Sequence, residues 1–312
     1  MQTAYLFPGQ GSQFVGMGRD LYEGNAAAKR VFERANEVLG FDLAALCFDG
    51  PEEELKQTKN TQPAIYVHSM AVLAALGWEP AGDDLALAGH SLGEYSAYAA
   101  AGALSFEDGL RLVRRRGELM WEAGQTQPGT MAAVLGLDGA AVEAALESVD
   151  GIVVPANLNS SSQIVISGEV AAVLAAMEVL KEAGARRVVQ LEVSGAFHSP
   201  LLATAADGLR EELEKTDVCT PRSAVIANAS AAPVTEPDAI RRSLVEQLTS
   251  PVRWEETLRR MVTDGANRFV EIGPGKVLSG LVRAVDRNLE VQAIGTLEQV
   301  DATVNGAMEE SR

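Results

Sequence analysis

The sequence has few cysteines, few basic residues and no long apolar run. Its 312 residues include 2 cysteines, Cys47 and Cys219, which lie far apart and lack zinc-type spacing, so we expect reduced thiols and no metal site. Lys and Arg number 26 against 43 Asp and Glu. The resulting net charge of -17 argues against nucleic acid as a partner, because neutralising phosphates requires clustered cations. With no signal-peptide pattern and no apolar run near the roughly 20 residues that span a bilayer, we expect a cytoplasmic protein without a membrane partner.

Strand-like and helix-like segments alternate along most of the chain. Short apolar segments that read as strands lie at 3–8, 85–89, 223–230 and 267–275. Segments with the apolar spacing of helices lie at 18–40, 61–77, 199–215, 239–250 and 254–265. This alternation predicts an α/β fold with a large α/β-hydrolase-like body, whose mostly parallel sheet is covered on both faces. The polar tail 301–312 carries no clear pattern.

The pattern changes between residues 129 and 195, where the order becomes strand, helix, strand, strand, helix, strand. That order is typical of a ferredoxin-like unit, which closes on itself and can be inserted into a larger fold. We therefore predict a small ferredoxin-like subdomain at 129–195, inserted into a large subdomain formed by 1–128 and 196–312. A ligand cleft is expected between the two.

The five residues Gly89-His90-Ser91-Leu92-Gly93 match the pattern G-x-S-x-G. In a nucleophile elbow this pattern turns the chain sharply from a strand into a helix and exposes the serine hydroxyl at the apex. The apolar strand before it and the helix-forming run after it provide the required context. The alternative is a structural turn in which the glycines only permit close packing.

A nucleophilic serine needs a base, and the chain contains 3 histidines. His68 lies within a helical segment and is better explained as a packed residue or one at the rim of the site, while His90 adjoins the serine and is expected to shape the turn. His198 follows a strand and precedes a helix that begins with Ser199-Pro200, so it is the candidate base for Ser91. No Asp or Glu in a distinctive setting lies between Ser91 and His198, which favours an unpaired main-chain carbonyl at a helix end as the group that orients the imidazole.

Arg116 interrupts an apolar stripe. At helical spacing its neighbours are Leu112, Val113, Leu119 and Met120, so its guanidinium requires an anion within an apolar environment. One interpretation is a buried ion pair with a protein carboxylate or a side chain that reaches the surface. The other is a bidentate grip on the free carboxylate of a substrate.

Taken together, the motifs resemble those of the malonyl-CoA:acyl-carrier-protein transacylase family. They run in order from "FPGQGSQ" through "TQPAIY", "GHSLGEYSA", "RRRGELM", "NSSSQIVISG", "GAFHSPL" and "SPVRW" to "EIGPGKVLSGLV". The resemblance implies that a malonyl group passes from malonyl-CoA through a malonyl-serine to the phosphopantetheine thiol of acyl carrier protein, in fatty acid or polyketide synthesis. The CoA thioester is then a substrate, and no tightly bound cofactor is expected.

The resemblance also implies the roles of individual residues. Ser91 would be the acylated nucleophile and His198 its base, oriented by the main-chain carbonyl of Gln247. The backbone N–H groups of Leu92 and Gln10 would form the oxyanion hole.

Two further positions are implied to select the acyl group. Arg116 would hold the malonyl carboxylate. Phe197, beside the base, is similar to the form that selects malonyl groups, whereas relatives that take methylmalonyl units usually carry serine there.

Three alternatives remain open at this point: an esterase or thioesterase, the malonyl transferase component of malonate decarboxylation, and a non-catalytic docking module. Because the chain and its expected carrier protein are both acidic, we also expect a basic patch at the mouth of the cleft. Its candidate residues are Lys181, Arg186, Arg187 and Lys276.

Overall fold

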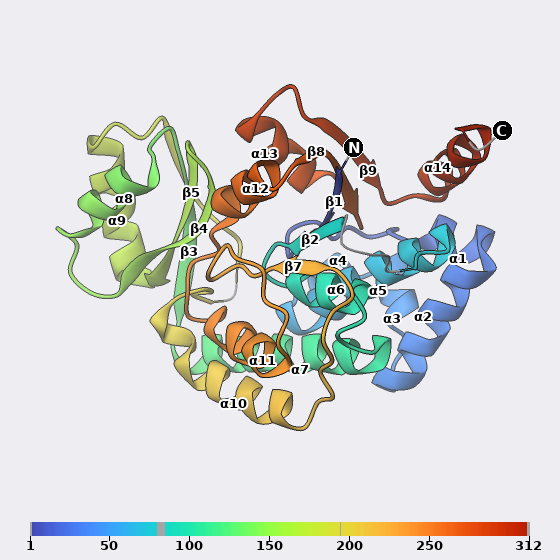
Figure 1. Ribbon diagram of the computed structural model, residues 1–312. Helices are drawn as coiled ribbons and strands as arrows, with labels where there is room; N and C mark the ends of the chain where they lie inside the picture. Colours follow the sequence, from blue (N-terminus) through green and yellow to red (C-terminus); the bar gives the residue numbers. More distant parts are fainter. Residues whose placement is uncertain (1, 80–84, 194, 311–312) are drawn as a thin grey trace.

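A computed structural model describes residues 2–79, 85–193 and 195–310, which form a parallel and a separate antiparallel sheet (Figure 1). The parallel sheet has five strands in the order β7-β2-β1-β8-β9. These strands are β1 (Gln2–Phe7), β2 (Leu85–Gly89), β7 (Ala224–Ile226), β8 (Ala266–Ile272) and β9 (Glu290–Ile294). The predicted α/β class and the mostly parallel sheet are therefore confirmed.

Helices cover both faces of the parallel sheet. Along β1, Ala4 and Leu6 pack into one core cluster, while Tyr5 and Phe7 contact another, as the period of two in a strand requires. The first cluster is covered by α12 (Trp254–Thr263) and α13 (Val277–Val285), and the second by α5 (Thr58–Leu76) and α6 (Gly93–Ala100). The carboxyl end of β2 leads directly into α6. The turn at Ser91 therefore lies where the strands of the parallel sheet end.

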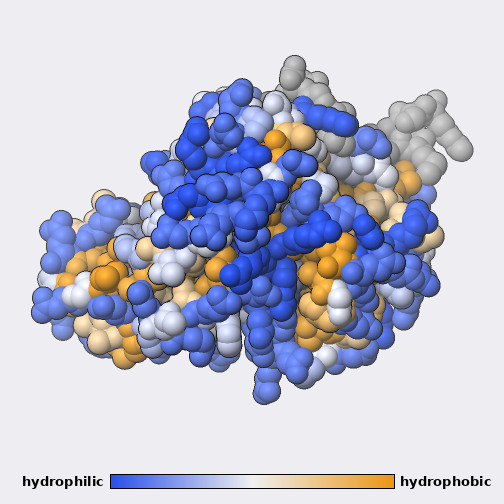
Figure 2. Space-filling view, turned by 90° about the horizontal axis from the view of Figure 1, so that it is seen from below, coloured by the Kyte–Doolittle hydropathy of each residue, from blue (hydrophilic) through white to orange (hydrophobic). Residues whose placement is uncertain are grey.

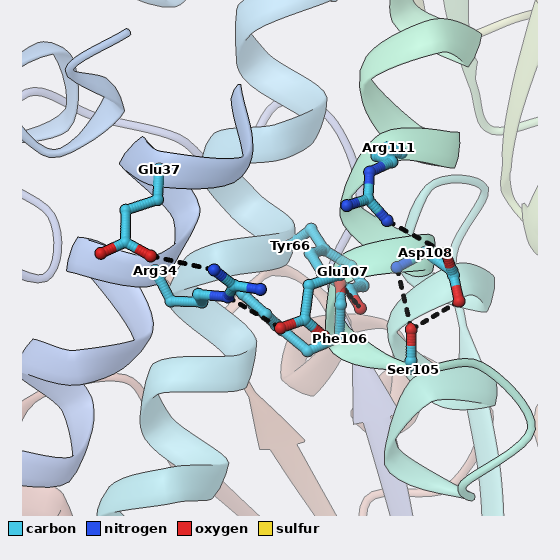
Figure 3. A network of polar contacts seen from close by, with 8 residues as sticks. All are labelled: Arg34, Glu37, Tyr66, Ser105, Phe106, Glu107, Asp108 and Arg111. Carbon is cyan, nitrogen blue, oxygen red and sulfur yellow. Dashed lines mark hydrogen bonds and ion pairs between the residues drawn. The ribbon is translucent and has the colours of Figure 1, made fainter. Parts of the chain in front are cut away.

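The helix α7 (Phe106–Thr126) carries Arg116, and its first turn is firmly anchored (Figure 3). The Ser105 hydroxyl accepts a hydrogen bond from the backbone N–H of Asp108 at 3.0 Å, which caps the helix. The Tyr66 hydroxyl, from α5, donates to the carbonyl oxygen of Phe106 at 3.1 Å. An exposed ion pair from α2 (Ala26–Leu39) joins Arg34 to Glu107 at 2.9 Å. These contacts fix the helix relative to its neighbours.

The antiparallel sheet has four strands in the order β4-β5-β3-β6. Its elements are β3 (Gly129–Leu135), α8 (Gly139–Leu146), β4 (Val153–Ser160), β5 (Gln163–Glu169), α9 (Val170–Glu182) and β6 (Arg187–Gln190). Ala132 and Val134 face a cluster formed with α8 and α9, whereas Met131 and Val165 belong to the core of the main body. The sheet therefore packs its own helices on one face and the large parallel part on the other, as Figure 1 shows.

The structure departs from the sequence prediction at several elements. The expected helix 18–40 is two helices, α1 (Arg19–Gly24) and α2, because the Asn25 side chain accepts hydrogen bonds from two backbone N–H groups and starts a new helix. The strand expected at 185–194 is limited to β6, and Ser194 lies outside the described residues. The tail, for which the sequence made no prediction, forms part of α14 (Leu297–Glu310).

The remaining helices and the molecular surface complete the fold. These helices are α3 (Leu43–Asp49), α4 (Glu52–Leu55), α10 (Ala203–Glu214) and α11 (Pro237–Glu246). Figure 2 shows a face that is mainly hydrophilic, with its hydrophobic residues in separate groups. Over residues 2–79, 85–193 and 195–310, no helix combines the length and the apolar composition that crossing a bilayer demands.

Candidate active site

Ser91 lies at the apex of a strained turn between β2 and α6. Its φ of 51° is in the left-handed region, which is uncommon for a residue with a side chain. The turn is so tight that a Cβ atom at Gly89 would overlap the backbone of Gly93, and one at Gly93 would overlap the carbonyl oxygen of Phe7. Both glycines of the motif are thus required by the close approach of backbone segments, and the serine side chain is left at the turn's apex.

His198 lies within hydrogen-bond distance of the serine. Its Nε2 is 2.7 Å from Ser91 Oγ, and its Nδ1 is 2.8 Å from the carbonyl oxygen of Gln247. Gln247 is the C-cap residue of α11, where main-chain carbonyls lack partners within the helix. Since a carbonyl can only accept, Nδ1 carries the proton and Nε2 is left to accept the proton of the serine hydroxyl.

Burial keeps the imidazole uncharged. His198 is 3% exposed, and desolvation, aided by the positive charge of Arg116, lowers its pKa from 6.5 to about 3. The ring is therefore neutral near pH 7, the state in which a general base acts.

Arg116 is almost fully buried, with 1% of its surface exposed, and its guanidinium points to the serine. It donates hydrogen bonds to Gln62 Oε1 at 2.8 Å, to Gln247 Oε1 at 2.9 Å and to Ser91 Oγ at 3.0 Å. Among the described residues, no carboxylate forms a direct ion pair with Arg116. The guanidinium is thus held by neutral oxygens, which leaves its positive charge available to an anion beside the serine.

Three groups behind the serine were missed from the sequence. Glu94 is fully buried, so the expectation that no distinctive carboxylate lies between Ser91 and His198 is wrong. The side chains of Asn228 and Gln247 are also buried in this network. The sequence signal for Glu94 is a single carboxylate in the alanine-rich run "EYSAYAAA".

Burial also shifts the pKa of Glu94. Desolvation raises the pKa of this carboxyl from 4.5 to about 7, against the opposing effects of its hydrogen bonds and of Arg116. Glu94 makes no hydrogen bond to His198 within the described residues. It is therefore not the third member of a hydrolase triad.

A cavity of about 110 Å³ opens at the serine. Six of the residues expected at the site line it: Gln10, Ser91, Leu92, Arg116, Phe197 and His198. Met131, Asn157, Leu191 and Val193 contribute from the side of the antiparallel sheet. The site therefore lies between the two parts of the fold, where the cleft was expected.

The backbone donors proposed for an oxyanion hole also border this cavity. In the part of the chain that the structure describes, no hydrogen bond takes up the N–H of Leu92 or of Gln10. An unpaired N–H beside a reacting centre is available to a developing negative charge.

The positions of the other two histidines do not suit the role of base for Ser91. His90 Nε2 is 2.8 Å from Asn159 Oδ1, so this ring ties the turn to β4 and does not contact Ser91 Oγ through a hydrogen bond. His68 is buried within α5, as expected for a packed residue, and desolvation lowers its pKa to about 4.

None of the four basic residues expected at the cleft mouth lines the cavity. Lys181 pairs with Glu178 on α9 at 2.7 Å, and Arg186 and Arg187 lie at the start of β6, the end of that strand farther from Leu191. Lys276 precedes α13. A role for these residues in docking stays a prediction. In residues 2–79, 85–193 and 195–310, no group of three or more His, Cys, Asp or Glu side chains is arranged to hold a metal ion.

Comparison with known proteins gives a consistent result over almost the entire chain. A family model described as acyl transferase domain matches residues 4–309. The chain is 48% identical to a malonyl CoA-acyl carrier protein transacylase of Bacillus subtilis, over 99% of this chain and 98% of the relative. Its structure is similar to a crystal structure of acyl-carrier-protein-S-malonyltransferase from Bartonella henselae, with a TM-score of 0.94, 42% identity and coverage of 98% and 99% of the two chains. A malonyl-transacylase solved in complex with its type II PKS acyl-carrier protein gives a TM-score of 0.93 at 39% identity, covering 98% of this chain and 100% of that one.

Proposed function

The chain belongs to the family of acyl transferase domains, and from that premise we propose that it transfers a malonyl group from malonyl-CoA to the phosphopantetheine thiol of acyl carrier protein. The observation that carries the proposal is that an imidazole and a guanidinium both contact the hydroxyl of Ser91. Ser91 Oγ lies 2.7 Å from a neutral imidazole and 3.0 Å from a buried guanidinium. A nucleophile, its base and a group that binds a carboxylate thus share one small cavity.

The reaction proceeds in two similar halves. Ser91 Oγ attacks the thioester carbonyl of malonyl-CoA while His198 Nε2 takes up the hydroxyl proton. The tetrahedral intermediate collapses, the bond to the CoA sulfur breaks, and His198 returns the proton to the leaving thiol. The carrier-protein thiol then attacks the malonyl-serine in the same way, and Ser91 is regenerated.

The N–H groups of Leu92 and Gln10 stabilise the oxyanion in this proposal. Such preorganised donors act on charge that develops in the transition state, and one donor contributes about 3–4 kcal/mol. Support comes from their position at the cavity and from the absence of a competing acceptor among the described residues.

Selection of the acyl group rests on Arg116 and Phe197. In the proposal, the malonyl carboxylate forms a bidentate pair with the guanidinium, which Gln62 and Gln247 hold in place through their amide oxygens. Phe197 lies against the same cavity and limits the space for a methyl branch. Discrimination by one such group is about 1–3 kcal/mol.

We also propose the finer description of the fold. The strand order β4-β5-β3-β6, with α8 and α9 on one face, supports a ferredoxin-like subdomain at 129–195 inserted into an α/β-hydrolase-like body of 1–128 and 196–312. A cytoplasmic location and the lack of a tightly bound cofactor stay predictions.

Intact-mass measurement tests the function. Incubation with malonyl-CoA is expected to add about 86 Da to Ser91, as covalent catalysis requires, and subsequent addition of phosphopantetheinylated carrier protein is expected to remove it to the carrier. Ser91→Ala is expected to show no adduct. Loss of the adduct to water at the same rate with and without the carrier protein would instead identify a thioesterase, and no adduct on the wild type would contradict the proposal.

A further inference from the structure

A single buried carboxylate oxygen connects the groups of the active site. Glu94 Oε2 accepts hydrogen bonds from Gln247 Nε2 at 2.7 Å and from the backbone N–H of Asn228 at 2.9 Å. We propose that Glu94 is a positioning residue that, through Gln247 and Asn228, holds Ser91, His198 and Arg116 in their reactive arrangement. This inference rests on the proposed function of those three residues.

The first connection runs through the side chain of Gln247. Because Glu94 accepts from Nε2, the amide oxygen must face the opposite way, where it accepts from Arg116 Nη2 at 2.9 Å. The same Nε2 donates to the carbonyl oxygen of Ser91 at 3.0 Å. If the Gln247 amide were reversed, its NH2 group would face the N–H donors of Arg116 and the hydrogen bond would be lost. The Glu94 carboxylate therefore selects the amide orientation that holds the guanidinium.

The main chain of Gln247 extends this connection to the base. Its carbonyl oxygen accepts from His198 Nδ1, so one residue contacts Glu94, Arg116 and His198. A shift of its side chain would move the guanidinium, and a shift that also displaced its main chain would move the imidazole.

The second connection runs through Asn228, just beyond β7. Its Oδ1 accepts from the Ser91 N–H at 2.7 Å, and its Nδ2 donates to the carbonyl of Gly89 at 2.8 Å. The side-chain amide of Asn228 therefore holds the strained backbone of the elbow on both sides of the turn, and the backbone N–H of the same residue is bound to Glu94.

Glu94 is fully buried although only one of its two carboxylate oxygens is hydrogen-bonded in the described structure. A carboxylate removed from water costs stability unless its oxygens are well paired, yet Oε1 has no hydrogen-bond partner within the described residues. Glu271 in β8 is equally buried, but both of its oxygens accept hydrogen bonds from the start of α13 at 2.7–3.1 Å. Glu271 serves a structural purpose and provides a matched control.

Two conservative substitutions of Glu94 distinguish the effect of its oxygen's position from the effect of its negative charge. Glu94→Gln removes the charge but keeps an oxygen that can accept from both donors, with its new amide group at the unpaired Oε1 position. Glu94→Asp keeps the charge but withdraws it by one carbon–carbon bond, roughly 1.5 Å. Positioning therefore predicts that Glu94→Gln is the more active variant.

The test measures labelling of Ser91 in the full chain by malonyl-CoA, by acetyl-CoA and by a fluorophosphonate probe that reacts with activated serines. We expect Glu94→Asp to slow both malonylation and phosphonylation on the order of 100-fold, as misplacement by an ångström does, and to lower the ratio of malonyl to acetyl transfer. Glu94→Gln is expected to stay within about tenfold of the wild type in all three. Glu271→Asp is expected to lower the unfolding temperature without changing the rates of the folded protein.

The outcomes distinguish this inference from the proposed function. A folded Glu94→Asp protein with wild-type rates and acyl preference, or a Glu94→Gln protein slower than Glu94→Asp, would overturn the positioning role. Wild-type protein that reacts with fluorophosphonate but not with malonyl-CoA would refute the malonyl transfer, while the variants' phosphonylation rates would still decide the role of Glu94. A wild type that reacts with neither would refute both.

Discussion

Replacing Arg116 with alanine should change which acyl group the protein accepts. The guanidinium donates to two amide oxygens and to Ser91 Oγ, and in the proposed complex it pairs with the malonyl carboxylate. Acetyl-CoA has no carboxylate and therefore loses no ion pair when the guanidinium is removed. The variant should lose activity toward malonyl-CoA and much of its discrimination against acetyl-CoA.

The magnitude follows from the bonds that disappear. A hydrogen bond to a charged group contributes about 1.5–3 kcal/mol, so a bidentate pair contributes about 3–6 kcal/mol, or on the order of 10² to 10⁴ in the malonyl-to-acetyl ratio of kcat/KM. Removal of the cation also withdraws the effect by which Arg116 lowers the pKa of Glu94, so the pKa of that carboxyl should rise further in the variant.

The assay measures kcat/KM for both thioesters beside the unfolding temperature of each variant. Arg114→Ala is the control, because Arg114 lies on the same helix but pairs with Glu118 at 2.7 Å and with the carbonyl of Lys59. That variant should keep its acyl preference and lose at most about 1 kcal/mol. A folded Arg116→Ala protein with unchanged malonyl preference would refute the carboxylate-binding role.

Other predictions concern pH, size selection and the elbow. Burial and the charge of Arg116 lower the pKa of His198, so the acidic limb of kcat/KM should fall below pH 6.5; a limb at 6.5 or higher would contradict this. Phe197→Ser should raise methylmalonyl relative to malonyl transfer about 10- to 200-fold, and an unchanged ratio would exclude this residue as a selector. Because folded Glu94 keeps a proton that the unfolded chain releases between pH 4.5 and about 7, its contribution to stability declines over that window by up to about 3 kcal/mol; denaturant unfolding of Glu94→Gln should lack this decline. Gly93→Ala should lose the fold or the elbow, and wild-type melting and acylation would disprove the tight-turn argument.

Local patterns were sufficient for the parts of the fold whose periodicity is strong. The apolar run 85–89 and the following helix predicted the strand and helix around Ser91, and the helical spacing around Arg116 predicted that this residue lies in the apolar stripe of its helix, where the structure buries it. Some elements were missed, including β9 and α13, although α13 has the apolar spacing of a helix and buries Leu278, Leu281 and Val282. β9 is an edge strand paired only with β8 in the described structure, so its residues are half-buried and do not form a continuous apolar run.

The residues of the active site also divide into those that local motifs predicted and those that only the structure revealed. The expected residues were found through motifs that act over a few positions, but Glu94 and the side chains of Asn228 and Gln247 were not. Glu94 looks like an ordinary acidic residue in the first turn of a helix, where carboxylates are favoured on the surface. Only the packing of the segments after β7 and at the end of α11 against the elbow reveals that this carboxylate is buried.

The amino-acid sequence by itself determined the turn at Ser91, because the pattern G-x-S-x-G between an apolar strand and a helix-forming run is local, although the Phe7 carbonyl that requires glycine at position 93 belongs to the tertiary structure. It also determined that a cation would lie in the apolar stripe of α7. The tertiary structure decided which groups surround that cation and that serine, since segments more than 100 residues apart meet there through side-chain and main-chain hydrogen bonds. Those contacts depend on the packing of whole elements, for which a local pattern carries no information.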